Sequence, residues 1–578
     1  MSAEKLITDH IDIWTSAVQA KSASGRGSSK KRELYGIKKL RELILELAVR
    51  GKLVPQDPTD EPALVLLERI AEEKAQLVKD KEIPKTKPLP AISPDEIPDD
   101  LPAGWSMVRL GEIVTKMGSG STPRGGQKAY VDDGVIFLRS QNVWNEGVRL
   151  DDVAYISDEV HQKMSNTKVL PGDVLLNITG ASLGRTTIFP SDFVEANVNQ
   201  HVTIIRLIEL EMNKFVHLGL MSPMVQKLVW GRQVGMAIEG LSKKVLEQFE
   251  FPIPPINEQH RIVAKVDELM ALCDQLEQQT EASLDAHQVL VETLLATLTN
   301  SQDATELMAN WARISEHFDT LFTTDQCIDQ LKQTILQLAV MGKLVPQDPN
   351  DEPAAKLLER IAEEKAQLVK EKKIKKQKAL PPIAEDEKPF ELPKGWEWCR
   401  FGTLVNFKAE LVRPEEYLDL DQVAPDSIEK GTGKLIKRRT VAESGVKGPN
   451  SRFYAGQILY SKIRPSLSKA IIAEFDGLCS ADMYPLETMV NSEFLLKIIL
   501  SEVFLTQVRA AENRIKMPKL NVDSLSNILV PICPDNEMGR ISSKLSELMF
   551  VSDQLKQQIN KSQQTQLQLT DAIVEQAV

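Results

Sequence analysis

The chain has 578 residues, of which 42% are hydrophobic and 26% charged, and its net charge is −12 at pH 7. This length exceeds what one hydrophobic core supports, so we expect several domains of ordinary globular composition. The first residues lack a basic region followed by an apolar core, and no uncharged apolar run reaches about 18 residues. The sequence therefore predicts neither a signal peptide nor a membrane span.

The N-terminal part is predicted to be a helical arm followed by a proline-rich linker. Four apolar residues spaced three or four apart share one helix face: Ile37, Leu40, Ile44 and Leu47. Gly51 and the prolines after it should end this helix, and a second amphipathic helix is predicted over 66–79. Residues 80–103 carry six prolines, which favour an extended chain. Residues 21–32 are predicted to form a flexible basic linker.

Two internal repeats organise the chain. The 36 residues that begin at Ile44 and those that begin at Ile335 are identical at 31 positions, with an offset of 291. A weaker repeat, with an offset of 279, relates the segments that begin at Pro252 and Pro531. The stretches between the repeats share little sequence. We therefore predict one duplicated helical frame around two diverged inserts, which suggests two readers of different targets on a common scaffold.

The order of the repeats predicts a nearly cyclic chain with pseudo-two-fold symmetry. The central frame is continuous, whereas the terminal frame is split between the two ends of the chain, which should lie close together. Long helices are predicted over 258–298 and after Pro531. The second has a heptad seam with polar interruptions at positions 541, 545, 548, 552, 555, 559, 562, 566, 569 and 573. We expect the two helices to pack on each other; ordinary core packing would give similar stripes.

Both inserts are predicted to be mixed α/β domains with short strands. The evidence is a set of β-branched runs bounded by glycine and polar turns: 134–143, 172–189, 201–207 and 456–475. The last run has the same layout as 172–189. A helix is expected to follow in each insert, at 212–230 and 493–511.

Polar residues on these strands are candidates for DNA contact, because Arg can form two hydrogen bonds with guanine and Asn or Gln with adenine. The alternative for each is a surface polar residue or a strand-end hydrogen bond, and the basic ones should contact phosphates more than bases. The candidates in the first insert are Arg124, Arg139, Gln141, Asn142, Asn177, Thr179, Arg185, Asn199 and Gln200. Those in the second are Lys437, Arg438, Arg439, Lys462, Arg464, Lys469, Arg514 and Lys516.

Local charge favours DNA binding more than the net charge does. The acidic total argues mildly against a nucleic-acid partner, but the field that attracts phosphates is local. Residues 430–469 contain ten Lys or Arg and one acid, Glu443. This segment could neutralise phosphates, and the alternative is a solvated basic loop.

The sequence lacks the common phosphate-binding, zinc-protease and amino-methyltransferase signatures. Residues 118–126 are glycine-rich but lack the Gly-Lys-Ser/Thr ending of a P-loop, and no GxGxxG, HExxH or N/D-PP-F/Y motif occurs. Asp192 and Glu195 lack the following ExK of a common nuclease core. We therefore expect no catalytic residue on this chain. The alternatives are a methyltransferase or nuclease with an unrecognised site, and a coiled-coil scaffold that binds only proteins.

Cysteine and histidine spacing predicts no metal site. The five cysteines are scattered and form no Cys-x-x-Cys pair, which favours reduced thiols in a cytoplasm; they are Cys273, Cys327, Cys399, Cys479 and Cys533. The seven histidines are also isolated. We expect neither a metal nor a cofactor on this chain.

Several motifs mark a family. PIPPINEQHRIVAKVDEL begins at Pro252, and its second copy, PICPDNEMGRISSKLSEL, departs from the pattern at Cys533 and Met538. GWSMVRLGEIV from Gly104 and GWEWCRFGTLV from Gly395 are similar to the opening of a target-recognition domain. With two variable domains alternating with two repeated helical segments, the chain resembles the specificity subunit of type I restriction–modification enzymes along essentially its whole length.

The resemblance implies an α+β fold: two mixed α/β target-recognition domains separated by long antiparallel coiled-coil helices, with an internal pseudo-two-fold repeat. The implied segments are a helical arm and linker (1–103), recognition domain 1 (104–253), a central helical region (254–394), recognition domain 2 (395–532) and a C-terminal coiled-coil helix (533–578).

The resemblance also implies a function. Each recognition domain would read one half of a bipartite, asymmetric site in double-stranded DNA, and the helices would set the spacing. Two methylation subunits would dock on the frame and supply S-adenosylmethionine-dependent methylation of adenine N6. Restriction subunits would add translocation and cleavage that require ATP and magnesium. The complex would be cytoplasmic.

Overall fold

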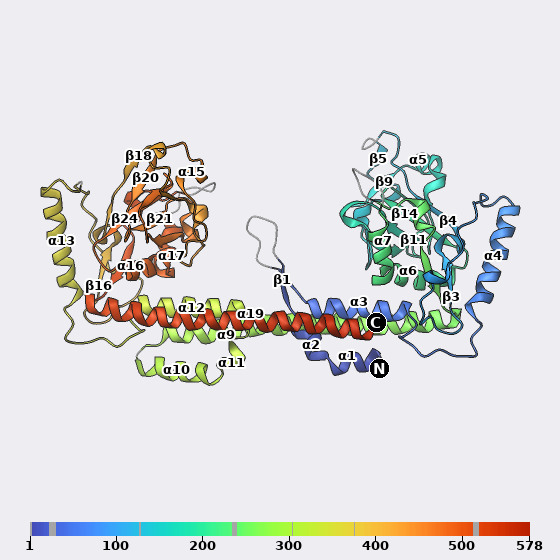
Figure 1. Cartoon of the computed structure of the whole chain (residues 1–578), viewed down its shortest axis with the longest axis horizontal. Coiled ribbons are helices and arrows are strands. Elements are labelled where there is room, and N and C mark those ends of the chain that lie inside the picture. The colour runs from blue at the N-terminus through green and yellow to red at the C-terminus, as the bar shows by residue number, and fades with distance from the viewer. Residues whose placement is uncertain are drawn as a thin grey trace. The chain divides into compact units, whose positions relative to one another are not determined.

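The chain divides into two compact units (Figure 1). Unit 1 contains Met1–Ser283 and Ser562–Val578, and unit 2 contains Leu284–Lys561. The computed structural model describes residues 3–21, 31–125, 129–233, 240–302, 304–374, 376–511 and 519–578. Each unit combines a helical frame with one sheet domain, so the predicted mixture of helix and sheet is confirmed. Every helix in these ranges is either too short or too polar to span a lipid bilayer.

The described part of the frame of unit 1 is helical apart from one pair of short antiparallel strands. Its elements are α1 (Ala3–Asp9), α2 (Ile11–Ser16), β1 (Gln19–Lys21), β2 (Lys31–Glu33), α3 (Tyr35–Val49), α4 (Ala63–Lys79), the first part of α9 (Ile256–Asn300) and the last part of α19 (Asp535–Ala577). The four apolar residues predicted to share a face of α3 are all buried. The helix ends before Gly51, whose φ of +66° suits glycine, and a Cβ there would lie 2.4 Å from Pro102.

The first sheet domain contains two main sheets, with strand orders β10-β13-β6-β9-β5 and β12-β11-β14-β4. Its strands are β3 (Ser106–Arg109), β4 (Val114–Ser119), β5 (Tyr130–Val131), β6 (Val135–Leu138), β7 (Val143–Trp144), β8 (Gly147–Val148), β9 (Ala154–Ile156), β10 (Lys168–Val169), β11 (Val174–Asn177), β12 (Thr186–Ile188), β13 (Ala196–Val198), β14 (Val202–Leu207) and β15 (Glu250–Ile253). Its helices are α5 (Asp158–Lys163), α6 (Asn213–Met221), α7 (Pro223–Gly231) and α8 (Lys243–Leu246). α6 packs on β12, and both α6 and α7 pack on α3 (Figure 1), so these helices join the domain to its frame.

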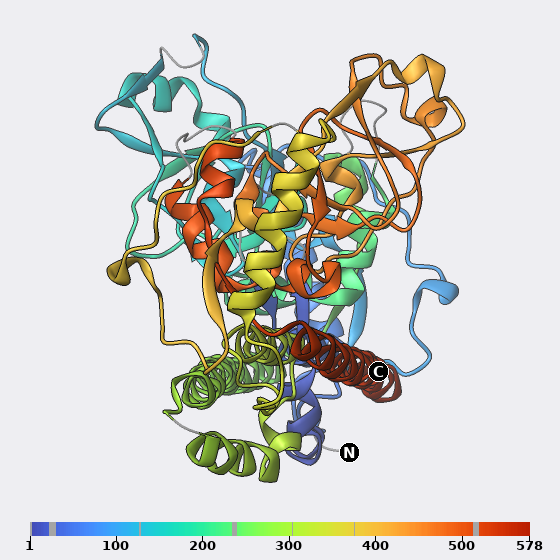
Figure 2. The same ribbon diagram turned by 90° about the vertical axis from the view of Figure 1, so that its left-hand side faces the viewer.

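Unit 2 repeats this plan. Its frame consists of the last part of α9, α10 (Ala304–Glu316), α11 (Phe318–Leu321), α12 (Asp325–Val340), α13 (Ala354–Lys370) and the first part of α19. α13 stands against the sheet domain (Figure 2), where the Lys365 ammonium donates to the carbonyls of Gly402 and Val405, at 2.8 Å each.

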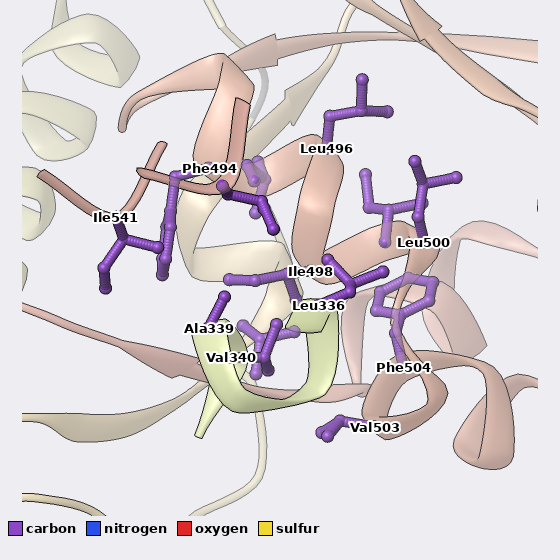
Figure 3. Packing of buried hydrophobic residues seen from close by; sticks show 14 of the residues in the cluster. Leu336, Ala339, Val340, Phe494, Leu496, Ile498, Leu500, Val503, Phe504 and Ile541 are labelled. Atoms are coloured by element: carbon purple, nitrogen blue, oxygen red, sulfur yellow. The ribbon is translucent and has the colours of Figure 1, made fainter. Parts of the chain in front are cut away.

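The second sheet domain has two four-stranded sheets, with orders β17-β24-β21-β22 and β18-β20-β23-β19. Its strands are β16 (Glu397–Arg400), β17 (Val405–Phe407), β18 (Glu410–Val412), β19 (Asp421–Val423), β20 (Asn450–Phe453), β21 (Ile458–Ser461), β22 (Ala470–Ile472), β23 (Gly477–Cys479), β24 (Met483–Thr488) and β25 (Leu529–Ile532). Its helices are α14 (Phe401–Leu404), α15 (Val441–Ser444), α16 (Ser492–Leu500), α17 (Glu502–Ala511) and α18 (Val522–Ser526). Figure 3 shows the core between α12 and this domain, where Leu336 and Val340 lie near Ile498 and Phe504.

One prediction about the inserts was wrong in detail. Each single helix expected after the strands is a pair of helices, broken at Ser222 in unit 1 and at Ser501 in unit 2. Ser222 has extended backbone and caps α7, whose first residue is Pro223, and a proline at that position cannot continue α6. The break turns the second helix of each pair back onto the frame.

The join between domain and frame in unit 1 is a polar cluster at the start of α9. The buried Glu258 carboxylate accepts hydrogen bonds from the Trp105 indole and from the Gln56 amide, both at 3.1 Å. Arg261, one turn later, forms an ion pair with Asp60 at 2.6 Å. The first strand of the sheet domain is therefore fixed to the first turn of the long helix.

Unit 2 repeats this cluster residue for residue. Trp396 donates to Glu537 at 3.1 Å, Gln347 donates to Glu537 at 3.3 Å, and Arg540 pairs with Asp351 at 2.5 Å. In both units a strand pair closes the sheet domain, β3 with β15 and β16 with β25. The repeat in the sequence is thus a repeat of individual contacts.

The last residues of the chain belong to the frame of unit 1. The Tyr35 hydroxyl on α3 donates to the Asp571 carboxylate of α19 at 2.7 Å, and Lys52 donates to the Val578 carbonyl at 2.8 Å. In unit 2, Lys343 donates to the Thr299 carbonyl of α9 at 2.9 Å, which is the equivalent contact. The end of the chain therefore completes the frame that the first helices begin, as the order of the repeats predicts.

The predicted heptad seam of α19 holds only in its first half. Ile541 and Leu545 are buried, but Ser562 is exposed and Leu569 is 46% exposed, while Thr570 is fully buried. The seam therefore moves by one residue beyond Ile559. A straight helix with 3.6 residues per turn drifts away from a strict seven-residue repeat, which explains this slip. The predicted packing of the two long helices on each other stays a prediction.

Candidate nucleic-acid interface

Each sheet domain presents one loop of the same shape. In unit 1 it joins β11 to β12, and Gly180 and Gly184 have φ values of +67° and +84°. In unit 2 it joins β21 to β22, and Arg464 and Ser468 have φ values of +45° and +49° at the equivalent positions. Left-handed backbone costs a residue with a Cβ about 1–2 kcal/mol. Unit 2 therefore holds two side chains where unit 1 has only glycine.

Beside this loop in unit 1, an indole lies between two guanidinium groups. The guanidinium carbons of Arg149 and Arg185 each lie 3.8 Å from the centre of the Trp144 ring. Trp144 is on the β7–β8 hairpin, whereas Arg185 immediately precedes β12. The indole nitrogen donates to the Gln141 carbonyl at 2.7 Å, which fixes the ring. Of these residues, only Arg185 and Gln141 were candidates from the sequence.

Two other candidates, Asn142 and Asn177, are buried inside this region. The Asn142 amide donates to the Arg149 carbonyl at 2.9 Å, and the Asn177 amide donates to the Ser140 carbonyl at 2.8 Å. Buried side chains with these bonds cannot reach a base without rearrangement. They position the hairpin that carries Trp144 rather than form part of the exposed surface.

A second polar group in unit 1 links three candidates through a histidine. Thr179 and His201 share a hydrogen bond of 2.6 Å, and Gln200 contacts the other ring nitrogen of His201 at 3.2 Å. Asn199 accepts from the backbone nitrogen of His201 at 3.1 Å. Arg124 is exposed on the loop after β4. Thr179, Asn199 and Gln200 therefore gather around His201, which sequence reasoning did not select.

Acidic neighbours neutralise several of the predicted cations. In unit 1, Asp152 lies 3.3 Å from Arg139 and accepts from Gln141 at 2.5 Å. In unit 2, Arg438 pairs with Asp421 at 2.7 Å, and this carboxylate raises the pKa of Arg438.

The rest of the basic segment of unit 2 is also partly satisfied internally. Arg439 pairs with Asp426 at 3.0 Å, and Lys469 donates to a backbone carbonyl at 2.6 Å. Lys462 lies over the Tyr484 ring at 5.2 Å. Lys437 and Arg464 are exposed. Two further candidates, Arg514 and Lys516, lie outside the described residues.

Metal binding and thiol reactivity depend on how the His, Cys, Asp and Glu side chains of the described residues are placed. Among them, no group of three or more His, Cys, Asp or Glu could hold a metal ion. All five cysteines are buried free thiols. Burial raises the pKa of the Cys273 thiol to about 11, which keeps it protonated and unreactive near neutral pH.

Comparisons with known proteins fit this architecture. A family model for the type I restriction modification DNA specificity domain matches residues 102–286. The type I restriction enzyme EcoAI specificity subunit of Escherichia coli is 43% identical over 601 aligned residues, which cover 100% of both proteins. The chain belongs to the family of type I specificity subunits. The EcoEI specificity subunit of Escherichia coli is 42% identical, again over 100% of both proteins. A chain from a structural study of complex assembly and conformational transition in the type I R-M system has a TM-score of 0.49 and 15% identity, and covers 82% of this chain and 98% of that chain.

The exposed surface of this type I specificity subunit differs from the sequence expectation in its aromatic and histidine members. Trp144 and Arg149 were missed because neither lies within a predicted strand, and His201 was missed although it begins the predicted strand 201–207. A local sign for Trp144 was its place next to the predicted strand 134–143. The stacking on Trp144 depends on the β7–β8 hairpin and the β11–β12 loop lying side by side, which no local pattern encodes.

Proposed function

We propose that the first sheet domain reads one half of a bipartite site in double-stranded DNA and the second sheet domain reads the other half. The observation that carries this proposal is the duplicated frame around two domains of unlike surface. Gly180 in the first loop corresponds to Arg464 in the second, and Thr179 corresponds to Ile463. Surfaces that differ at equivalent positions favour different bases, so the site should be asymmetric.

The proposed contact surface consists of the exposed or half-buried candidates. In the first sheet domain these are Arg124, Arg139, Gln141, Thr179, Arg185, Asn199 and Gln200. In the second they are Lys437, Arg438, Arg439, Lys462, Arg464 and Lys469, with Arg514 and Lys516 as sequence-based additions. Cations already paired with acids should contribute less to phosphate binding than Lys437 and Arg464, because their charge is partly balanced.

A domain exchange tests the two-reader arrangement. The chain enters and leaves the first sheet domain through the paired strands β3 and β15, so residues 104–253 can be replaced by the same segment of another family member. Mapping of methylated bases in cells that express the hybrid system should show one altered half-site and one unchanged half-site. Simultaneous change of both halves would contradict the proposal.

The long helices are the proposed spacer between the half-sites. α9 has 45 residues, which at a rise of about 1.5 Å per residue gives roughly 68 Å. Successive major-groove faces are about 34–36 Å apart, so a helix of this length can separate two readers by a turn of DNA. Seven residues inserted after both Ser283 and Lys561, where the two long helices pass from one unit to the other, should lengthen the gap between half-sites. The same insertion in one helix only is the control and should impair assembly; an unchanged gap in the double insertion refutes the spacer role.

The frame is the proposed docking place for two methylation subunits. Each unit exposes two apolar side chains at equivalent positions of the long helices, Leu272 and Leu569 in unit 1 and Val551 and Leu290 in unit 2. Exposed aliphatic side chains at repeated positions favour two copies of one partner. Leu272→Asp or Val551→Asp should reduce the bound methylation subunits from two to one in native mass spectrometry, and retention of two in both variants would contradict this docking place.

The chemistry is proposed to belong to the partners. Methylation subunits would supply S-adenosylmethionine-dependent methylation of adenine N6, and restriction subunits would supply cleavage that requires ATP and magnesium. The chain purified alone should neither methylate nor cut DNA, and addition of the partners should restore both reactions. Methylation by the isolated chain would overturn this assignment.

A further inference from the structure

The stack of Arg149, Trp144 and Arg185 in the first sheet domain has a defined geometry. Two guanidinium carbons at 3.8 Å from one ring centre cannot occupy the same face without overlapping, so they lie on opposite faces of the indole. Each guanidinium then offers its N–H edge outward, since its flat face is against the ring. Two like charges held this close repel each other, so an electron-rich ligand at their outer edges is favoured.

The stack is built from two chain segments that are locked together. The Thr186 backbone nitrogen donates to the Asn145 side chain of the hairpin at 3.0 Å, and Thr186 directly follows Arg185. The Arg149 backbone nitrogen donates to the Asn142 carbonyl at 2.9 Å. The buried amide of Asn142 holds the same hairpin, as described above. The two cations are therefore positioned before any ligand arrives, which lowers the entropy lost on binding.

The two arginines are not equivalent. Arg149 lies 3.4 Å from the Glu146 carboxylate, and its side chain is 49% exposed. Arg185 forms no ion pair within the described residues, and it leaves the glycine-containing loop between β11 and β12. Arg185 therefore has an uncompensated N–H edge, whereas Arg149 clamps the ring from the other face.

We propose that Arg185 reads a guanine in the first half-site, with Trp144 and Arg149 as its positioning residues. A planar guanidinium fixed by stacking presents two parallel N–H groups, which match the O6 and N7 acceptors of guanine in the major groove. A phosphate would be bound well by any flexible cation and would not need this fixation. This assignment rests on the proposed function, because it requires that the first sheet domain contacts one half-site.

The test uses the complex reconstituted with its partner subunits and duplexes that carry the mapped site. Each guanine of the first half-site is replaced in turn by 7-deazaguanine, which lacks the N7 acceptor. The wild-type complex should lose affinity by about 10-fold or more at one of these guanines. Arg185→Lys keeps the charge but not the planar pair of donors. It should lose affinity for the unmodified site and become insensitive to 7-deazaguanine at that position, with an unchanged salt dependence.

Four further variants distinguish a loss of base recognition from a loss of folding. Trp144→Leu should show the same insensitivity at the same guanine, and Trp144→Phe should keep part of the discrimination because a ring is retained. Arg69→Lys changes an exposed arginine on α4 that pairs with Glu61, and it should bind like the wild type. Arg464→Lys should alter affinity only through the second half-site. Assembly of every variant with the partner subunits shows that the frame is intact.

Several outcomes would overturn the assignment. One is an Arg185→Lys complex that keeps the wild-type response to 7-deazaguanine at every position, and another is a first half-site without guanine. If domain exchange still alters one half-site in these cases, the proposed function stands and only the role of Arg185 is lost. If exchange of residues 104–253 alters neither half-site, the proposed function itself fails.

Discussion

Replacing Glu258 by leucine should loosen the join between the first sheet domain and its frame. The side chain is 1% exposed and accepts hydrogen bonds from Trp105 and Gln56. Leucine has a similar volume but no acceptor, so the Trp105 indole loses its partner, whereas the Gln56 amide still donates to the Gly51 carbonyl at 2.7 Å. Gln56 is exposed and can turn to water, whereas Trp105 is 6% exposed and keeps a buried, unsatisfied N–H.

The loss of stability can be estimated from the difference between the buried Trp105 donor and the exposed Gln56 donor. An unsatisfied buried donor costs about 1–3 kcal/mol, and a hydrogen bond lost at an exposed group costs about 0.5 kcal/mol. Removal of a buried carboxylate offsets part of this, because burial raises the pKa of Glu258 and so disfavours its ionised form. The net loss of stability should be about 1–3 kcal/mol. Because the folded pKa is raised, the contribution of Glu258 is largest below its unfolded pKa and falls as the pH rises through the folded value.

Hydrogen exchange with mass spectrometry can locate the loss. Peptides that cover β3 and β15 should exchange about 5-fold to 150-fold faster in Glu258→Leu, and those that cover β16 and β25 should be unchanged. Glu537→Leu is the matched control and should reverse the pattern. Trp105→Phe added to Glu258→Leu should cost less than the sum of the two single changes, because it removes the unsatisfied N–H. Equal acceleration in both units, or additive losses, would refute the reasoning.

Four other changes test the packing, a buried lysine and the backbone of the second loop. Gly36→Ala should destabilise unit 1 by about 1–3 kcal/mol in urea unfolding, since its Cβ would lie 2.2 Å from the Trp14 carbonyl oxygen. Gly539→Ala, with open space around its Cβ, should stabilise α19 by about 0.5–1 kcal/mol, and a loss there would contradict the packing. Burial lowers the pKa of Lys365 to about 8, so the unfolded chain holds more protons above that pH. The stability of the wild type relative to Lys365→Met should therefore rise between about pH 8 and 10. Arg464→Gly should stabilise unit 2 by about 1 kcal/mol by relieving its positive φ, while it weakens DNA binding; unchanged affinity would remove Arg464 from the interface.

The helical frame was predictable because its sequence occurs twice in the chain. The apolar spacing from Ile37 to Leu47 gave the buried face of α3, and the constant offsets gave the equivalence of residues such as Glu258 and Glu537. Where prediction failed, the cause was local geometry. The break at Ser222 depends on one proline, and the slip of the seam after Ile559 depends on helix drift over many turns. Neither the proline nor the drift alters the average spacing of apolar residues, on which the helix predictions were based.

The candidate interface was less predictable. Residue type selected Asn142 and Asn177 for their amides, but their hydrogen bonds are to backbone carbonyls inside the first sheet domain. The same rule missed Trp144, because an aromatic residue beside a strand usually belongs to a core. Both faces of the Trp144 ring are stacked because Arg149 and Arg185, which lie 36 positions apart in the chain, meet at this ring. Sequence patterns do not report such long-range placement.

The split frame has a consequence for the order of folding during synthesis. The ribosome makes residues 284–561, which are the whole of unit 2, before it makes residues 562–578. Asp571 and Val578 accept hydrogen bonds from Tyr35 and Lys52, so the frame of unit 1 is complete only after these last residues are made. The unit that contains the first residues is therefore finished last, which reverses the usual order in which N-terminal domains fold first.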